Sequence, residues 1–186
     1  PQTVFRVASI SKLLTTTLVL AAVDAGLIDL DEPVNRYLPA DLQITTKDGE
    51  PATSRVRTLL SHTSGLPAGA RGADLGNPAL TRIANAGPLR SLDDAISALQ
   101  LVPRPGERVV YSNAAFNVAG FIAARAFGLP FEAAARTRLL EPLGMTGAAF
   151  TPQRVGPGVA TPYGSIAPPG VGAKPADRIR LVATPM

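Results

Sequence analysis

An apolar stretch near the start of the chain, LLTTTLVLAAV at residues 13–23, constrains the fold more than any other segment. It is too short to span a bilayer, which takes about 20 apolar residues, and it carries three threonines. The pattern predicts a helix from Ser9 to about Ala25, with Gly26 as its C-terminal stop. Because this helix is apolar on nearly all sides, we expect it to lie in the centre of a domain.

The sequence pattern predicts a mostly helical structure for the rest of the chain up to about residue 150. A second strongly apolar helix, AAFNVAGFIAARAF at residues 114–127, should end at Gly128. The segment PFEAAARTRLLEPLGM predicts a third helix, with Pro130 at its first helical position.

Shorter elements fill the remaining sequence. Residues 55–67, RVRTLLSHTSGLP, predict a short helix, and residues 91–100 predict another that opens with a capping box. Alternation around residues 48–49 predicts a small β-hairpin. Residues 151–186 hold seven prolines and five glycines with little periodicity, so we separate this irregular segment from a helical part at 1–150. No segment of this pattern supplies a large sheet.

The composition of the chain excludes several classes of protein. With 186 residues, 46% hydrophobic and 17% charged, it is globular, and it is long enough for one sizeable core or most of a larger domain. It has no cysteine and a single histidine, His62, so we expect no disulfide and no zinc site of the usual ligands. The net charge of +4 is scattered without a basic run, so we do not expect nucleic-acid binding.

A serine and a lysine stand one helical turn apart just before the apolar stretch, in FRVASISKLL at residues 5–14. A Ser-x-x-Lys pair occurs by chance about once in a chain of this size, and Ser9 and Lys12 could simply be surface positions. Their context favours chemistry, because residues i and i+3 share a helix face and helix-terminal N–H groups point toward developing negative charge. Apolar neighbours disfavour a charged lysine, and a neutral amine can take the proton of a serine hydroxyl.

A second candidate pair lies in the sequence YSN, on the loop before the helix predicted from residue 114. Tyr111 is either a turn residue or a phenol that relays protons. Asn113 is either the N-cap of the following helix or an amide that orients a substrate. Spacing alone does not decide between these alternatives.

The single histidine, His62 in LLSHTSGLP, invites a Ser/His/Asp interpretation. However, no Gly-x-Ser-x-Gly elbow occurs anywhere in the chain. A lone histidine beside a helix end is more often a structural residue with satisfied hydrogen bonds. We therefore interpret His62 as structural.

Together these residues resemble those of the serine β-lactamase and D,D-peptidase superfamily, above all its class C type and the related esterases and D-aminopeptidases. FRVASISK is similar to the first motif of the family and YSN to the class C form of the second. Four longer segments resemble family-typical stretches in the family's order: LIDLDEPVNRYLP, VRTLLSHTSGLP, PGERVVYSNAAFNVAGFIAA and LLEPLGMTGAAF. The resemblance runs from about residue 3 to residue 150.

The resemblance implies an α/β (α+β) β-lactamase/D,D-peptidase-like fold and a serine hydrolase that forms an acyl-enzyme on an amide, ester or β-lactam. Ser9 would be the nucleophile and Lys12 the general base, while Tyr111 would relay the proton to the leaving group and Asn113 would bind substrate. It implies no metal and no cofactor, and its partner is a small-molecule or peptide acyl substrate. The alternative is a non-catalytic module of the same fold that binds peptidoglycan-type peptides or protein partners.

The chain also departs from the family. The third motif, Lys-Thr-Gly or His-x-Gly on a strand, does not occur, since the only lysine after residue 47 is Lys174, which Pro175 follows. We therefore expect a fragment that is mostly the helical domain, with the main antiparallel sheet largely missing. An acyl-transfer site needs two N–H donors at the oxyanion. We expect residues 1–186 alone to lack one donor, to be inactive, and to expose the apolar helix that contains Ser9.

The resemblance favours a bacterial protein in the periplasm or outside the cell. The chain shows no signal peptide, and no segment indicates membrane association. Location and preferred acyl group therefore stay open at the level of sequence.

Overall fold

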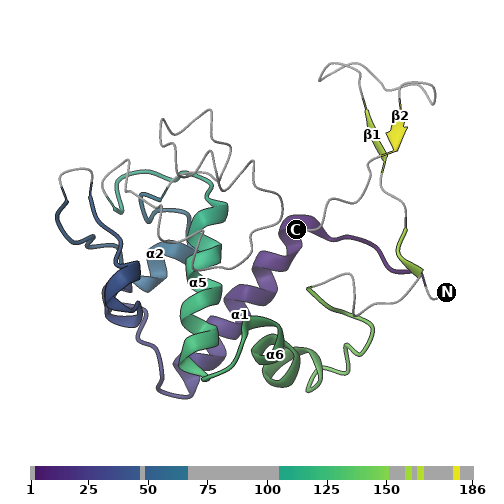
Figure 1. Ribbon diagram of the computed structural model, residues 1–186, viewed down its shortest axis with the longest axis horizontal. Helices are drawn as coiled ribbons and strands as arrows, with labels where there is room; N and C mark the ends of the chain where they lie inside the picture. The colour runs from purple at the N-terminus through teal and green to yellow at the C-terminus, as the bar shows by residue number, and fades with distance from the viewer. Residues whose placement is uncertain are drawn as a thin grey trace.

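The computed structural model describes residues 3–46, 49–66, 105–150, 158–160, 163–165 and 178–180. Two helices of 14 residues dominate this part of the chain and pack side by side, α1 (Ser11–Asp24) and α5 (Asn113–Ala126) (Figure 1). They confirm the two long apolar helices predicted from the sequence.

A 3₁₀ turn, η1 (Ala8–Ile10), leads directly into α1. The helical segment thus begins one residue before Ser9. At the other end Gly26 has φ +70°, and the N–H of Leu27 donates to the carbonyl of Ala22 across 2.9 Å. This left-handed C-terminal cap confirms Gly26 as the stop of the helix.

The two long helices differ in how far they are buried. Nine residues of α5 are buried, whereas α1 buries only Thr15, Leu18, Val19 and Ala22. Leu13 and Leu20 of α1 keep 66% and 45% of their surface exposed. The described residues cover only part of α1, so the central place predicted for this helix is seen on one side and stays a prediction on the other. The expected exposure of the apolar helix is confirmed.

The helix α6 (Phe131–Ala135) crosses α5 where Gly120 leaves room for an aromatic ring. A Cβ at Gly120 would lie 3.1 Å from a ring carbon of Phe131. Pro130 is the N-cap of α6, with an extended ψ of 148°, so its predicted place at the first helical position is wrong by one residue. The chain continues as a π-helical turn, η4 (Arg136–Leu140). In the described ranges no single helix is long and apolar enough to cross a membrane. The helix α5 and the α6–η4 helix reach that length and apolar character only when they are taken together, and the pair is bent by 74°.

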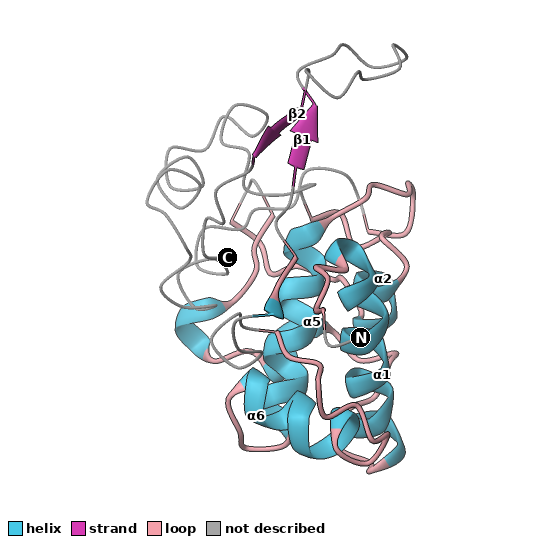
Figure 2. Ribbon diagram, turned by 90° about the vertical axis from the view of Figure 1, so that its right-hand side faces the viewer, coloured by secondary structure: helices cyan, strands magenta, loops and turns pink. Residues whose placement is uncertain are grey.

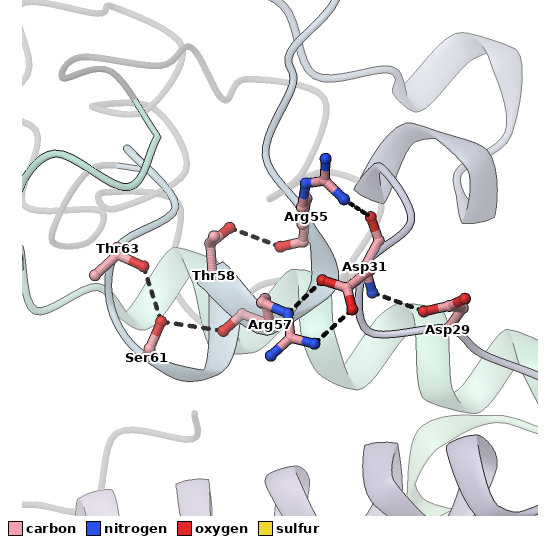
Figure 3. A network of polar contacts seen from close by, with 7 residues as sticks. All are labelled: Asp29, Asp31, Arg55, Arg57, Thr58, Ser61 and Thr63. Carbon is pink, nitrogen blue, oxygen red and sulfur yellow. Dashed lines mark hydrogen bonds and ion pairs between the residues drawn. The ribbon is translucent and has the colours of Figure 1, made fainter.

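The short helix α2 (Val56–Leu60) confirms the helix predicted within residues 55–67. Arg57 anchors it, because its guanidinium donates hydrogen bonds of 2.6 Å to both carboxylate oxygens of Asp31 (Figure 3). These bonds hold the pKa of the Asp31 carboxyl below its usual value. Arg55 adds a hydrogen bond of 2.6 Å to the backbone carbonyl of Asp31. The loop after α1 is thereby tied to α2.

The segment between α1 and α2 is irregular, with two 3₁₀ turns, η2 (Val34–Tyr37) and η3 (Ala40–Leu42). The hairpin predicted around residues 48–49 is present only as one antiparallel bridge, between Thr45 and Pro51, in the part of it that the structure describes. Residue Gly49 in this turn has φ +84°, a conformation that glycine adopts without steric cost.

Among the described residues, regular β-structure is limited to two short strands, β1 (Tyr163–Ser165) and β2 (Arg178–Arg180), which pair antiparallel and stand apart from the helices (Figure 1 and Figure 2). A parallel bridge joins Val4, just before η1, to Val159. The described residues form no larger sheet, which agrees with the expected, mostly helical fragment. The helix predicted at residues 91–100 lies outside the described residues.

Candidate active site

Ser9 lies in η1 and Lys12 lies in the first turn of α1. The Lys12 amine donates a hydrogen bond to Ser9 Oγ across 3.2 Å. Side chains three residues apart in a 3₁₀ turn stand almost in line, so the turn brings these two groups together. The amine reaches the hydroxyl, as the spacing predicts.

Tyr111 meets the same serine from a distant part of the sequence. Its hydroxyl donates a hydrogen bond to Ser9 Oγ across 2.7 Å. The Lys12 amine lies 4.9 Å from the centre of the Tyr111 ring and 5.6 Å from that of Phe116. The two aromatic rings and the serine therefore surround the amine, and Ser9 Oγ has two potential proton carriers within hydrogen-bond distance.

Asn113 contributes to the cluster through its side-chain carbonyl, whose Oδ1 accepts a hydrogen bond from the Lys12 amine across 2.6 Å. The N-cap of α5 is Ser112, a buried residue whose hydroxyl accepts from the N–H of Ala115 across 3.0 Å. The interpretation of Asn113 as the N-cap is therefore wrong, because the neighbouring serine already fills that position. Asn113 instead faces Lys12 from the first residue of the helix.

Within this cluster the charge of Lys12 acts on the pKa of the Tyr111 phenol. Hydrogen bonding to Lys12 first, and to Ser9 second, holds the pKa of the Tyr111 hydroxyl below its usual value of 10.0. A positive charge beside the phenol stabilises its ionised form. Tyr111 keeps 49% of its surface exposed, and Ser9 and Asn113 are also exposed, so these groups are open to solvent.

Backbone strain is found at the same place. Of the residues that the structure describes, two other than glycine have a positive φ, Ala8 at 45° and His62 at 59°. Ala8 immediately precedes Ser9, and His62 packs against Tyr111 with 4.4 Å between ring centres. Left-handed backbone costs a residue with a Cβ free energy, and such strain tends to cluster at functional sites.

The Nδ1 of His62 accepts a hydrogen bond from the N–H of Ser112 across 3.0 Å, a contact that agrees with the structural interpretation made from the sequence. The sequence did not reveal that this histidine lies beside Tyr111. The two residues are far apart along the chain, so only the fold brings them together, and a backbone hydrogen bond of 2.8 Å from Val110 to His62 holds the two segments. No group of three or more His, Cys, Asp or Glu side chains that could hold a metal ion occurs among the described residues.

The chain matches the family model described as Beta-lactamase over residues 1–184. It is 31% identical over 150 residues to the D-alanyl-D-alanine-carboxypeptidase/endopeptidase AmpH of Escherichia coli (strain K12), a match that covers 80% of this chain and 37% of AmpH. It is 34% identical over 175 residues to the esterase EstB of Burkholderia gladioli, over 87% of this chain and 42% of EstB. The chain thus spans about two fifths of the length of these curated relatives.

Solved structures show the same likeness. EstCE1, described as a hydrolase with promiscuous acyltransferase activity, superposes with a TM-score of 0.71 at 26% identity, over 95% of this chain and 50% of EstCE1. The expected resemblance to the serine β-lactamase and D,D-peptidase superfamily, and to its fold, is confirmed. Since the family model covers almost every residue, the chain belongs to the beta-lactamase family.

Proposed function

We propose that the protein is a serine hydrolase that forms an acyl-enzyme on Ser9. The observation that carries this proposal is the meeting of three groups at one solvent-open point: Ser9 Oγ lies 2.7 Å from the Tyr111 hydroxyl and 3.2 Å from the Lys12 amine. A serine hydroxyl needs a neighbouring proton acceptor to become a strong nucleophile, and this cluster offers two candidates.

In the proposed acylation step, Ser9 Oγ attacks the carbonyl carbon of the substrate. The neutral form of Lys12 takes the hydroxyl proton as the general base and becomes an ammonium. Tyr111 relays this proton from Lys12 to the leaving group, so that the carbon–heteroatom bond breaks, the acyl group stays on the serine and Lys12 is neutral again. In the second step, Tyr111 helps to activate a water, which attacks the ester carbonyl and releases the acid and Ser9. The lowered pKa of Tyr111 favours this exchange of protons.

Asn113 has the role of a substrate ligand in this proposal. Its Oδ1 accepts from Lys12, which leaves the side-chain NH₂ as a donor for the amide or ester oxygen of the substrate. The bond to Lys12 also fixes the amide in one orientation. Asn113 would therefore act mainly on substrate binding and choice.

The substrate class that we propose is an amide, an ester or a β-lactam. The named relatives support this breadth, since one is a carboxypeptidase and endopeptidase, another is an esterase, and EstCE1 is a hydrolase with acyltransferase activity. The chain covers less than half of the length of AmpH and EstB, so the activity of the whole protein is part of the proposal.

A reporter assay on the full-length protein tests the proposal against the non-catalytic binding module. We expect hydrolysis of a nitrophenyl ester or a chromogenic cephalosporin, and its loss in Ser9→Ala. Ser11→Ala is the matched control, because Ser11 is the next serine along the chain. A folded protein that binds peptidoglycan-type peptides and turns over neither reporter would support the binding module instead.

A further inference from the structure

His62 lies just after α2 and faces the loop that carries Tyr111. Its Nδ1 accepts a hydrogen bond from the N–H of Ser112 across 3.0 Å, and its carbonyl oxygen accepts one from the N–H of Val110 across 2.8 Å. Its ring lies 4.4 Å from the ring of Tyr111 and 5.1 Å from that of Phe116, measured between centres. One residue thus contacts the backbone on both sides of Tyr111 and the tyrosine ring itself.

The backbone of His62 is strained, and its neighbours maintain it. Its φ of 59° lies in the left-handed region, which glycine adopts at lower cost than a residue with a Cβ. On one side the Ser61 hydroxyl bonds to the carbonyl of Arg57 and to the hydroxyl of Thr63 (Figure 3). On the other side the N–H of Thr63 donates to the carbonyl of Thr58 across 3.0 Å. The anchored helix α2 therefore sets the position of His62.

We propose that His62 is a positioning residue for the reaction of Ser9, which acts as a neutral imidazole and fixes the loop that holds the Tyr111 hydroxyl against Ser9 Oγ. The step that depends on it is the proton transfer at this 2.7 Å contact. Nδ1 must be unprotonated to accept from Ser112, so the neutral ring carries its proton on Nε2. The role in the reaction rests on the function proposed above, whereas the hydrogen bond and the protonation state of the ring do not.

A neutral ring makes the loop sensitive to acid. Protonation of His62 would place an N–H on Nδ1, where it would oppose the N–H of Ser112. Burial first, and the charge of Lys12 second, hold the pKa of His62 below its usual value of 6.5. Within the part of the chain that the structure describes, the titratable groups that act on the ring are Lys12 from α1 and Tyr111 from the loop, while α5 contributes the uncharged Phe116. The stabilisation is complete above pH 6.5 and is lost as the pH falls through the lowered pKa.

Nitrogen-15 NMR of the full-length protein tests the protonation state without any need for activity. The His62 resonances are identified by their loss in His62→Asn. We expect a proton on Nε2 at neutral pH, a midpoint below 6.5, and a change in the Ser112 amide resonance with that same midpoint. A proton on Nδ1 at neutral pH, or a Ser112 amide that ignores the titration of His62, would overturn the proposal.

Three variants separate the hydrogen-bond acceptor from the rest of the side chain. The asparagine of His62→Asn tolerates a positive φ and carries an acceptor near the place of Nδ1, whereas the longer glutamine amide of His62→Gln reaches toward the place of Nε2. We expect acylation of Ser9 by a fluorophosphonate to fall about 10- to 100-fold in His62→Ala and in His62→Gln. In His62→Asn it should fall less than about 5-fold. In the wild type we expect the rate of acylation to fall at acid pH as His62 is protonated, and this acid limb of the pH profile should disappear in His62→Asn.

The outcomes distinguish this role from a merely structural one. Equal losses in all three variants, with the acid limb unchanged, would overturn the positioning role. A wild-type protein that fluorophosphonate does not label at Ser9 would overturn both the proposed function and the positioning role, but the NMR result on the Ser112 hydrogen bond would stand. Because the NMR titration needs only the wild type and His62→Asn, failure of His62→Ala or His62→Gln to fold leaves that test in place.

Discussion

The helices α1 and α5 have the same length and a similarly apolar composition, yet the protein uses them differently. Nine residues of α5 are buried and it forms the middle of the helical core. Four residues of α1 are buried, while Leu13 and Leu20 face outward. The catalytic candidates lie where the less buried helix begins, beside the start of the more buried one.

This difference shows how the site combines rigidity with access. The start of α5 supplies a rigid support, because Ser112 caps the helix and is itself buried. The start of α1 supplies accessible groups, since Ser9 is exposed and Lys12 is partly exposed. A nucleophile must be reached by its substrate, and the groups that activate it must be held in place. The start of α1 meets the requirement for access, and the start of α5 meets the requirement for a fixed position.

The largest effect should come from the buried side of α1. Leu18 is fully buried and Leu20 is 45% exposed, so the same substitution can be compared on the buried and the exposed side of the helix. We expect Leu18→Ala to lower the free energy of unfolding of residues 1–186 by about 3 kcal/mol, because it leaves a cavity in the core. Leu20→Ala should cost less than about 1 kcal/mol.

Denaturant unfolding followed by circular dichroism measures both variants. Similar losses for Leu18→Ala and Leu20→Ala would contradict the unequal burial of α1. In the full-length protein, a cost for Leu20→Ala as large as that for Leu18→Ala would show that the rest of the protein covers this side of the helix.

The next effect concerns the exposed start of α1. Lys12→Arg keeps the positive charge but removes the amine that we propose as the base. We expect acylation in the full-length protein to fall by a factor of about 100 or more, which corresponds to about 2.7 kcal/mol of transition-state stabilisation. Stopped-flow acylation by a nitrophenyl ester measures it. Acylation at the wild-type rate in Lys12→Arg would assign the base to another group.

A smaller effect separates two adjacent residues at the start of α5. Ser112→Ala removes the N-cap and should lower the free energy of unfolding by about 1 kcal/mol. Asn113→Ala should leave stability within about 0.5 kcal/mol and instead raise KM, because its side chain bonds to Lys12 and not to the helix backbone. Thermal unfolding and steady-state kinetics on the same two variants test the division. A stability loss in Asn113→Ala with unchanged kinetics would reverse the assignment.

The smallest effect is a shift in the titration of one tyrosine, at the point where the two helix starts meet. Ultraviolet difference spectra should show a phenol that ionises below pH 10.0 and is lost in Tyr111→Phe. In Lys12→Met the same phenol should ionise at a higher pH, since the neighbouring positive charge is gone. If the pKa of Tyr111 were the same in the wild type and in Lys12→Met, the charge of Lys12 would not act on the phenol.

Sequence patterns were enough to predict the parts of the fold that depend on local preferences. Apolar periodicity and the glycines at 26 and 128 defined α1 and α5, because each glycine adopts the left-handed conformation that ends its helix. The pairing of Ser9 with Lys12 followed from helical spacing, and the family resemblance brought in Tyr111 and Asn113. These features need no knowledge of contacts between distant segments.

The remaining features depend on tertiary contacts that no local pattern contains. One side of α1 is exposed because burial depends on which segments pack against a helix, not on its composition. The role of Ser112 as N-cap was missed because Ser112 and Asn113 are both good N-cap residues and only the geometry of the helix start separates them. The contact of His62 with Tyr111 arises because α2 packs against α5.

Mass spectrometry of the acylated full-length protein tests the central claim most directly. Trypsin cuts after Arg6 and Lys12, so Ser9 and Ser11 fall in the same short peptide, and fragmentation of that peptide assigns the adduct to one of them. After treatment with a β-lactam or a fluorophosphonate, we expect the added mass on Ser9. The added mass on Ser11, or an adduct that persists in Ser9→Ala, would contradict it.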